Sequence, residues 1–231
     1  MHEIERKFLL LQSGAQIERA AAENGSLESR RLIQQRYLGP AGWRLRAKAT
    51  GTGCTVVRTI SLKRRAGERL DFNVDQEAWD RLVQVAEPSR NKTGDAPGTI
   101  RVRMDDLSGW TIRLRRSTNV AGQDVRCYLT MKRKVTMMRC VEIESRVPEA
   151  QHENARGLFG PAVRKRRICV RHAGRTWEID VFLNPELMGI ELVEIELPCE
   201  SVNPSMPTWV GREITQERGY KNAKLVKQIA A

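Results

Sequence analysis

The sequence predicts a mainly β fold of the α+β class, arranged as a sandwich or a barrel. Many stretches alternate between polar and apolar residues with a period of two, and β-branched or aromatic residues fill many of their positions. Helical patterns are few, and many strands with few helices are typical of sandwiches and barrels. With 231 residues, the chain is long enough for one large β domain or two small ones.

The predicted elements can be placed in order along the chain. Strands are expected at residues 3–10, 32–38, 99–104, 110–116, 127–134, 140–147, 168–171, 177–183 and 192–197. Helices are expected at residues 76–87, 148–159 and 222–229. The first helix follows an acidic residue and the second has proline as its first helical residue, both of which favour helix initiation. Residues 90–98 contain Asn, Gly, Asp and Pro and are expected to form a loop.

The chain is strongly basic, with 40 Lys and Arg against 28 Asp and Glu and a formal net charge of +12. Proteins with such a charge tend to meet polyanions, such as nucleic acid, anionic lipid or phosphorylated small molecules. No apolar stretch approaches the roughly 18 residues that cross a bilayer, and the charged start lacks the apolar core of a signal peptide. The five cysteines form no C-x-x-C pair, so neither a zinc site nor a disulfide framework is indicated. We therefore expect a cytoplasmic protein without a membrane partner.

The polar face of the predicted strands is charged, and most strands carry charges of one sign. Side chains two residues apart on a strand point the same way, roughly 7 Å apart, so each pair can face a common target. The acidic pairs are Glu3 and Glu5, Glu142 and Glu144, Glu178 and Asp180, and Glu194 and Glu196. The basic pairs are Arg101 and Arg103, Arg113 and Arg115, Lys132 and Lys134, and Lys165 and Arg167. An ordinary solvent face would mix the signs, whereas segregated strands suit a cavity in which carboxylates hold Mg²⁺ or Mn²⁺ and basic groups hold phosphate.

Two stretches of the chain resemble each other. The first comprises residues 43–46, 61–65 and 70–74, and the second comprises residues 110–115, 130–134 and 141–145. Each is followed by a helical pattern, so the chain contains either a partial duplication or two hairpins built to one pattern. The first stretch has Asp71 and Asn73 where the second has Glu142 and Glu144, which makes the first a weaker candidate for metal binding. We predict a single domain over residues 1–231, with an insertion or partial duplication at about 40–98.

An E-x-E-x-K strand at Glu3-Ile-Glu-Arg-Lys7 resembles the CYTH superfamily of triphosphate tunnel metalloenzymes. Further segments resemble the strands and closing segment of that family in order: 33–38, 100–103 or 112–115, 128–132, 142–144, 165–167, 177–182, 192–197, 211–215 and 220–222. The resemblance covers residues 1–38 and 99–225. It implies a closed antiparallel eight-stranded β-barrel with a few flanking helices, in which a triphosphate binds inside the barrel.

The chain departs from the family pattern in two places. A long segment separates the second strand from Arg101, where the family has a short connection. Arg44, Arg46 and Lys63 in that segment are therefore an alternative source of the R-x-R pair and the lysine. Arg146 also stands where the family commonly has an acidic residue.

The resemblance implies a metal-dependent triphosphatase and assigns its site residues. Catalytic roles fall on Glu3, Glu5 and Lys7. The substrate-binding residues are Lys7, Arg101, Arg103, Arg113, Arg115, Lys132, Lys165 and Arg167. The ligands of magnesium or manganese are Glu3, Glu5, Glu142, Glu144, Asp180, Glu194 and Glu196, with Asp180 orienting an arginine as the alternative.

The expected substrate is tripolyphosphate, thiamine triphosphate or a nucleoside triphosphate. An RNA 5′-triphosphatase is a second hypothesis, because the basic residues 58–69 would help to hold an RNA backbone. Class IV adenylyl cyclase and a non-catalytic polyphosphate- or nucleotide-binding module are further alternatives. The expected partner is accordingly a small-molecule triphosphate, with an RNA 5′ end and a second copy in a homodimer as alternatives.

Overall fold

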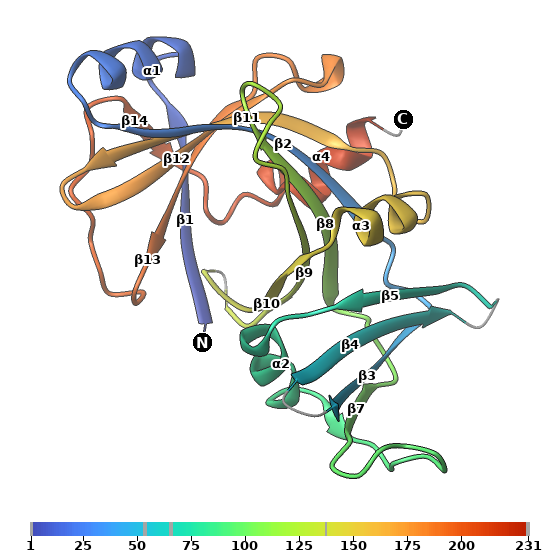
Figure 1. Cartoon of the computed structure of the whole chain (residues 1–231). Coiled ribbons are helices and arrows are strands. Elements are labelled where there is room, and N and C mark those ends of the chain that lie inside the picture. The colour runs from blue at the N-terminus through green and yellow to red at the C-terminus, as the bar shows by residue number, and fades with distance from the viewer. Residues whose placement is uncertain (1, 53–54, 65–66, 137, 230–231) are drawn as a thin grey trace.

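The computed structural model describes residues 2–52, 55–64, 67–136 and 138–229 (Figure 1). Its strands and helices follow in the order β1 (His2–Leu10), α1 (Gly14–Glu23), β2 (Leu27–Leu38), β3 (Trp43–Thr52), β4 (Thr55–Arg64), β5 (Arg69–Asn73), α2 (Gln76–Val83), β6 (Glu87–Pro88), β7 (Ile100–Met104), β8 (Trp110–Asn119), β9 (Arg126–Lys134), β10 (Arg139–Val147), α3 (Glu149–Arg156), β11 (Val163–His172), β12 (Arg175–Phe182), β13 (Glu191–Leu197), β14 (Val210–Glu213) and α4 (Asn222–Ile229). None of the helices in these ranges is long and apolar enough to cross a membrane.

Eight strands close into an antiparallel barrel (Figure 1). Their order around the wall is β10, β9, β8, β2, β11, β12, β13 and β1. The ring closes because β1 pairs with β10 as well as with β13, and β14 adds to the far end of β1. The pairing confirms the closed eight-stranded barrel that the resemblance implies. Closure also removes the free sheet edges along which open sheets aggregate.

A second sheet contains five strands in the order β5, β4, β3, β7 and β6. It is formed by the chain between β2 and β8, and Figure 1 shows it projecting from one side of the barrel. One face of this sheet is apolar and packs with α2 and with the lower barrel wall in a single buried cluster. The fully buried members from this sheet and α2 include Leu45, Ile60, Leu62, Phe72 and Leu82.

The two similar stretches of sequence adopt the same local arrangement. β3, β4 and β5 form an antiparallel meander that is followed by α2, and β8, β9 and β10 form another that is followed by α3. The second meander belongs to the barrel wall, whereas the first belongs to the other sheet. The first stretch therefore does not supply strands to the barrel.

Among the elements that the period-two and helical patterns did not predict are α1 and β14. α1 begins at a capping box, in which the Ser13 hydroxyl accepts from the Gln16 amide and the Gln16 side chain accepts from the Ser13 amide. Its first residue, Gly14, lies so close to Val181 on β12 that a Cβ atom there would be 2.6 Å from the valine methyl group. β14 spans only Val210–Glu213, which is too short for a clear alternation.

Candidate functional site

The barrel encloses a cavity of about 320 Å³, which is small among ligand sites. Charged side chains from β1, β8, β9, β10, β11 and β13 line it. Those that the sequence predicted are Glu3, Glu5, Lys7, Arg113, Arg115, Lys132, Glu142, Glu144, Arg167, Glu194 and Glu196. Alternation along each strand turns these residues inward, while their neighbours, such as Ile4 and Phe8 on β1, pack in an apolar cluster.

The strand register sets acidic and basic residues directly beside one another. Glu5 is opposite Glu196, and Lys7 is opposite Glu194, on the paired strands β1 and β13. Lys132 is opposite Glu142 on β9 and β10. Since directly opposed residues have Cβ atoms about 5 Å apart, these groups share one interior surface.

Glu3, Glu142 and Lys132 form a compact acidic corner of the cavity. The Lys132 ammonium lies 2.5 Å from a Glu3 carboxyl oxygen and 2.6 Å from a Glu142 oxygen. Burial, followed by a hydrogen bond with Glu142, raises the pKa of Glu3 to about 9. Burial also acts to raise the pKa of Glu142, but the hydrogen bond from Glu3 and the charges of Lys132 and Arg113 lower it to about 2. The two neighbouring carboxyl groups therefore have pKa values that are displaced in opposite directions.

A second network joins β1, β11 and β13 through Glu194. One Glu194 oxygen lies 2.6 Å from the Lys7 ammonium, and the other accepts from Arg167 at 2.9 Å. Burial acts to raise the pKa of Glu194, but the charges of Lys7, Lys165 and Arg167 outweigh it and hold that pKa well below its usual range. Glu194 is therefore ionised and holds both cations at the cavity wall.

Glu144 holds two arginines side by side on β8. It accepts from Arg113 at 3.0 Å through one oxygen and from Arg115 at 2.7 Å through the other. The Thr130 hydroxyl donates to the same carboxylate at 2.7 Å. The Arg115 guanidinium also lies over the Tyr128 ring, 4.5 Å from its centroid. These contacts fix the orientation of both guanidinium groups.

Lys165 and Asp180 are buried behind the cavity wall and do not line the cavity. They are 0% and 1% exposed, and the Lys165 ammonium donates to Asp180. Arg167 donates to both Asp180 oxygens at 2.7 Å. Both Asp180 oxygens therefore accept hydrogen bonds from neighbouring cations, and the assignment of Asp180 as a metal ligand or as a residue that orients Arg167 stays a prediction.

The expectation that Arg101 and Arg103 join this cluster is wrong. Both lie on β7, which pairs with β3 and β6 of the second sheet, so neither lines the cavity. Arg101 instead pairs with Asp95, in the loop that precedes β7. The same placement excludes Arg44, Arg46 and Lys63 from the cavity, since they lie on β3 and β4. The R-x-R pair of the cavity is Arg113 and Arg115.

Several cavity residues escaped the sequence prediction. Tyr37 lies among the basic side chains, and its hydroxyl donates to Gln35 at 3.3 Å. Thr111 also lines the cavity, as does Lys134, which the sequence had paired with Lys132 but had not assigned a binding role. The alternation of Thr111 with Arg113 on the same strand could have found it. Lys221, just before α4, could not be found in this way because a helical segment carries no period-two pattern.

Oxygen ligands of the kind that Mg²⁺ and Mn²⁺ prefer are present in the cavity. Within the described ranges, however, no group of three or more His, Cys, Asp or Glu side chains is arranged to hold a metal ion. The carboxyl groups of the cavity best suited to bind such an ion are those of Glu3, Glu5, Glu142 and Glu196. Burial and the charges of Glu178, Glu142 and Glu5 raise the pKa of Glu196, with only Lys132 acting against them. A divalent cation would relieve this repulsion.

Two characterised proteins are similar to this chain in sequence, and both are inorganic triphosphatases. The one from Acetivibrio thermocellus is 36% identical over 102 residues, which is 43% of this chain and 65% of the relative. The one from Nitrosomonas europaea is 30% identical over 115 residues, which is 46% of this chain and 72% of the relative. The chain thus spans a little under two thirds of the length of the first of these relatives. No family model matches the chain.

Two solved structures are also similar over most of the chain. The PH1012 protein from Pyrococcus horikoshii OT3 covers 99% of this chain and 87% of its own length, with 14% identity and a TM-score of 0.37. The Hippeastrum protein HpAC1, for which a dominant triphosphatase activity is described, covers 85% and 80%, with 14% identity and a TM-score of 0.38.

The sequence relatives agree with the architecture and with the inward-facing E-x-E-x-K strand. Glu3, Glu5 and Lys7 lie on β1, which closes the barrel, and all three line its cavity. The chain belongs to the CYTH superfamily of triphosphate tunnel metalloenzymes.

Proposed function

We propose that the barrel binds a small linear triphosphate and hydrolyses one of its phosphoric anhydride bonds with the help of Mg²⁺ or Mn²⁺. The observation that carries the proposal is the convergence of Lys7, Arg113, Arg115, Lys132 and Arg167 from four strands on one closed cavity with a carboxylate-rich corner. The sequence relatives named inorganic triphosphatases support it.

The basic residues would bind the phosphate oxygens. In the structure each of these basic groups donates to a carboxylate. A bound triphosphate would replace some of those carboxylate oxygens with phosphate oxygens, and the N–H donors are already oriented to receive them. Arg113 and Arg115 present their guanidinium groups side by side because Glu144 binds both. Arg167 is fixed from behind by Asp180, which also accepts a hydrogen bond from Lys165.

Hydrolysis requires a water oxygen to attack a phosphorus atom in line with the anhydride bond that breaks. The departing oxygen takes the electron pair, and negative charge spreads over the phosphoryl oxygens. Lys7 and Lys132 lie where they would donate hydrogen bonds to these oxygens and stabilise that charge. Lys7 is buried, which strengthens its contacts with these oxygens.

Glu3, Glu5, Glu142 and Glu196 would hold the metal ion. When bound, Mg²⁺ or Mn²⁺ would neutralise part of the phosphate charge and lower the pKa of the attacking water molecule. The raised pKa of Glu3 opposes its ionisation in the metal-free protein, and a bound cation would lower that pKa because metal ions bind the ionised carboxylate.

Among the three expected substrates, the cavity favours inorganic tripolyphosphate. Tyr37 is the one aromatic side chain among the described residues that line the cavity. A nucleobase or a thiazole ring would therefore find no pair of aromatic faces to stack between. We expect tripolyphosphate to have a higher kcat/KM than ATP or thiamine triphosphate.

The test is phosphate release from tripolyphosphate, ATP and thiamine triphosphate, with Mg²⁺ or Mn²⁺ and with chelator. Glu5→Gln removes a carboxylate that lines the cavity, with little change in side-chain size, and should abolish metal-dependent turnover. Glu87→Gln removes the same charge from an exposed residue of β6 and should leave turnover unchanged. Equal activities for both variants, or full activity in chelator, would contradict the proposal.

A further inference from the structure

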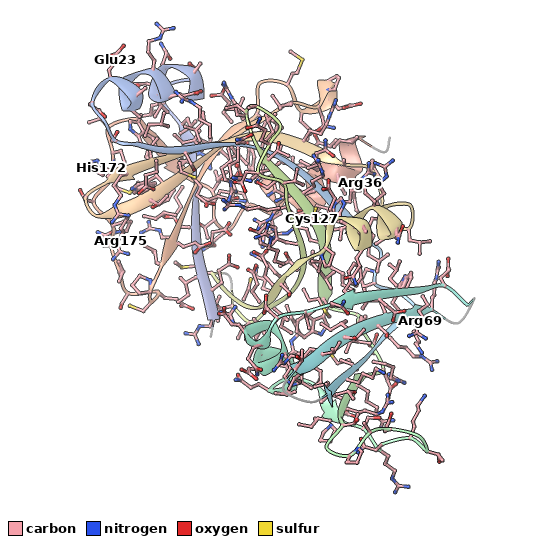
Figure 2. All side chains as sticks on the ribbon, viewed as in Figure 1. Glu23, Arg36, Arg69, Cys127, His172 and Arg175 are labelled. Carbon is pink, nitrogen blue, oxygen red and sulfur yellow. The ribbon has the colours of Figure 1, made fainter. Side chains whose placement is uncertain are left out.

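The second sheet has a polar face that is separate from the barrel cavity. Its apolar face packs with α2, and the opposite face of β3, β4, β5 and β7 carries basic residues. We call this set the cationic face, and its members are Arg44, Arg46, Lys48, Lys63, Arg69, Arg101 and Arg103. Figure 2 shows Arg69 on this sheet, at the end remote from α2.

The strand register brings like charges directly opposite one another. Arg69, Lys63 and Arg44 form one row across β5, β4 and β3. In the adjoining rows, Arg46 is opposite Arg103 and Lys48 is opposite Arg101. Because like charges in opposed positions destabilise a sheet, the stability of the sheet does not account for this arrangement.

Acidic side chains neutralise only part of the cationic face. The ion pairs are Arg46 with Asp105, Arg69 with Asp71, Arg101 with Asp95, and Arg103 with Glu87 and Asp105. Arg44, Lys48 and Lys63 form no ion pair with any residue in the described ranges. Burial and the charges of Arg69 and Lys92 lower the pKa of Lys63, which reflects the density of positive charge around it.

We propose that the cationic face binds the phosphate backbone of a double-stranded nucleic acid. Arg44, Arg46 and Lys48 form a line along β3 with a spacing of about 7 Å, which is of the order of the separation between successive phosphates in a nucleic-acid strand. A line of cations on a flat sheet can therefore follow one strand of a duplex. Such contacts hold the backbone without reading base sequence.

The residues between these cations argue against a single-stranded nucleic acid or a protein as the partner of this face. They are Ser61, Thr59, Asp71 and Asn73, with Val57 at the end of the β3–β4 hairpin. The face has no aromatic side chain on which unpaired bases could stack, as single-strand binding sites have. It also lacks the cluster of aromatic and apolar anchors that typically dominates the energetics of protein–protein interfaces.

The test measures binding of short labelled RNA and DNA duplexes to the whole chain by fluorescence anisotropy, from about 50 to 200 mM salt. The variant Arg44→Gln/Lys48→Gln/Lys63→Gln removes the three unpaired cations. Each phosphate contact adds about 0.9 to the slope of log affinity against log salt, so the loss of three lowers that slope by about 2.7. Over this salt range the wild-type affinity should therefore fall about 40-fold more than that of the variant.

A matched control removes the same charge from the barrel exterior: Arg19→Gln/Arg164→Gln/Arg175→Gln. None of these three residues forms an ion pair among the described residues, and Figure 2 shows Arg175 at the β11–β12 hairpin, far from the second sheet. Phosphate release from tripolyphosphate, measured on all three proteins, reports the barrel separately. Equal losses of duplex affinity in both triple variants would overturn the proposal. So would wild-type protein that binds no duplex at low salt, or that binds only single strands or polyphosphate.

Discussion

Removal of Asp180 and removal of Lys165 are predicted to have unequal effects on stability, although the two residues form one buried ion pair. Arg167 donates to both oxygens of Asp180, at 2.7 Å each. Asp180→Asn therefore leaves two buried cations beside a neutral amide. Lys165→Met leaves Asp180 still paired with Arg167, and its side chain has a volume close to that of lysine.

The magnitudes follow from burial. Breaking a buried ion pair by removing one partner costs about 3–5 kcal/mol of unfolding free energy. Burial and the Arg167 charge lower the pKa of Lys165 to about 8. Since one pKa unit is about 1.4 kcal/mol, the charged lysine costs the folded state about 3 kcal/mol even with Asp180 beside it. Lys165→Met relieves that cost, so we expect it to lower the unfolding free energy by less than about 2 kcal/mol, against about 3–5 kcal/mol for Asp180→Asn.

Urea denaturation between pH 7 and pH 10.5 tests this reasoning. The unfolded chain keeps the Lys165 proton up to the ordinary pKa of 10.5, whereas the folded protein loses it near a pKa of about 8. Between these values Lys165 binds more protons in the unfolded state, so the unfolding free energy of the wild type should rise with pH relative to that of Lys165→Met. A larger loss of stability at pH 7 for Lys165→Met than for Asp180→Asn would refute the reasoning.

Three further predictions concern the barrel. Glu144→Gln should raise the KM for tripolyphosphate about tenfold with a smaller change in kcat, because Arg113 and Arg115 lose the charged group that orients them; an unchanged KM would count against this role. Trp177→Ala should lower the unfolding free energy by about 3–5 kcal/mol in urea denaturation, since Trp177 is fully buried; a loss below about 1 kcal/mol would contradict it. Glu196→Gln should raise the melting temperature of metal-free protein at pH 8 and not at pH 4, because a carboxyl group with a raised pKa destabilises the folded state only above the unfolded value of 4.5. Equal shifts at both pH values would exclude that cause.

The barrel strands could be predicted because their interior is charged and their exterior packing is apolar, which produces a clear alternation. The limits of β2 and β11 could not, because β2 begins at Leu27 and β11 begins at Val163, and charged residues near these ends interrupt the pattern. α1 was missed because three of its ten residues face the core and the rest give only a weak helical stripe.

The cavity residues could be predicted from their sequence pairs, but which R-x-R pair faces inward could not. Arg101-Val-Arg103 and Arg113-Leu-Arg115 have the same local pattern. Their different positions depend on strand pairing, since β7 joins β3 and β8 joins β2 and β9. Pairing between distant strands is a property of the whole chain, and a window of a few residues does not contain it. The burial of Asp180 behind Arg167 could not be predicted for the same reason, because it depends on how β11 and β12 pair in the folded barrel.

Closure of the barrel through β1 has a consequence for the order in which the protein can fold. During synthesis β1 emerges early, but its partners β10 and β13 follow only after Arg139 and Glu191. Until then β1 is an unpaired edge, and contacts between segments so far apart in sequence form slowly. The second sheet, in contrast, is contiguous between Trp43 and Met104 and needs no later strand for its own pairing. We therefore expect the nascent chain to form this sheet first and to close the barrel last. During translation, β1 is then the segment most exposed to incorrect strand pairing.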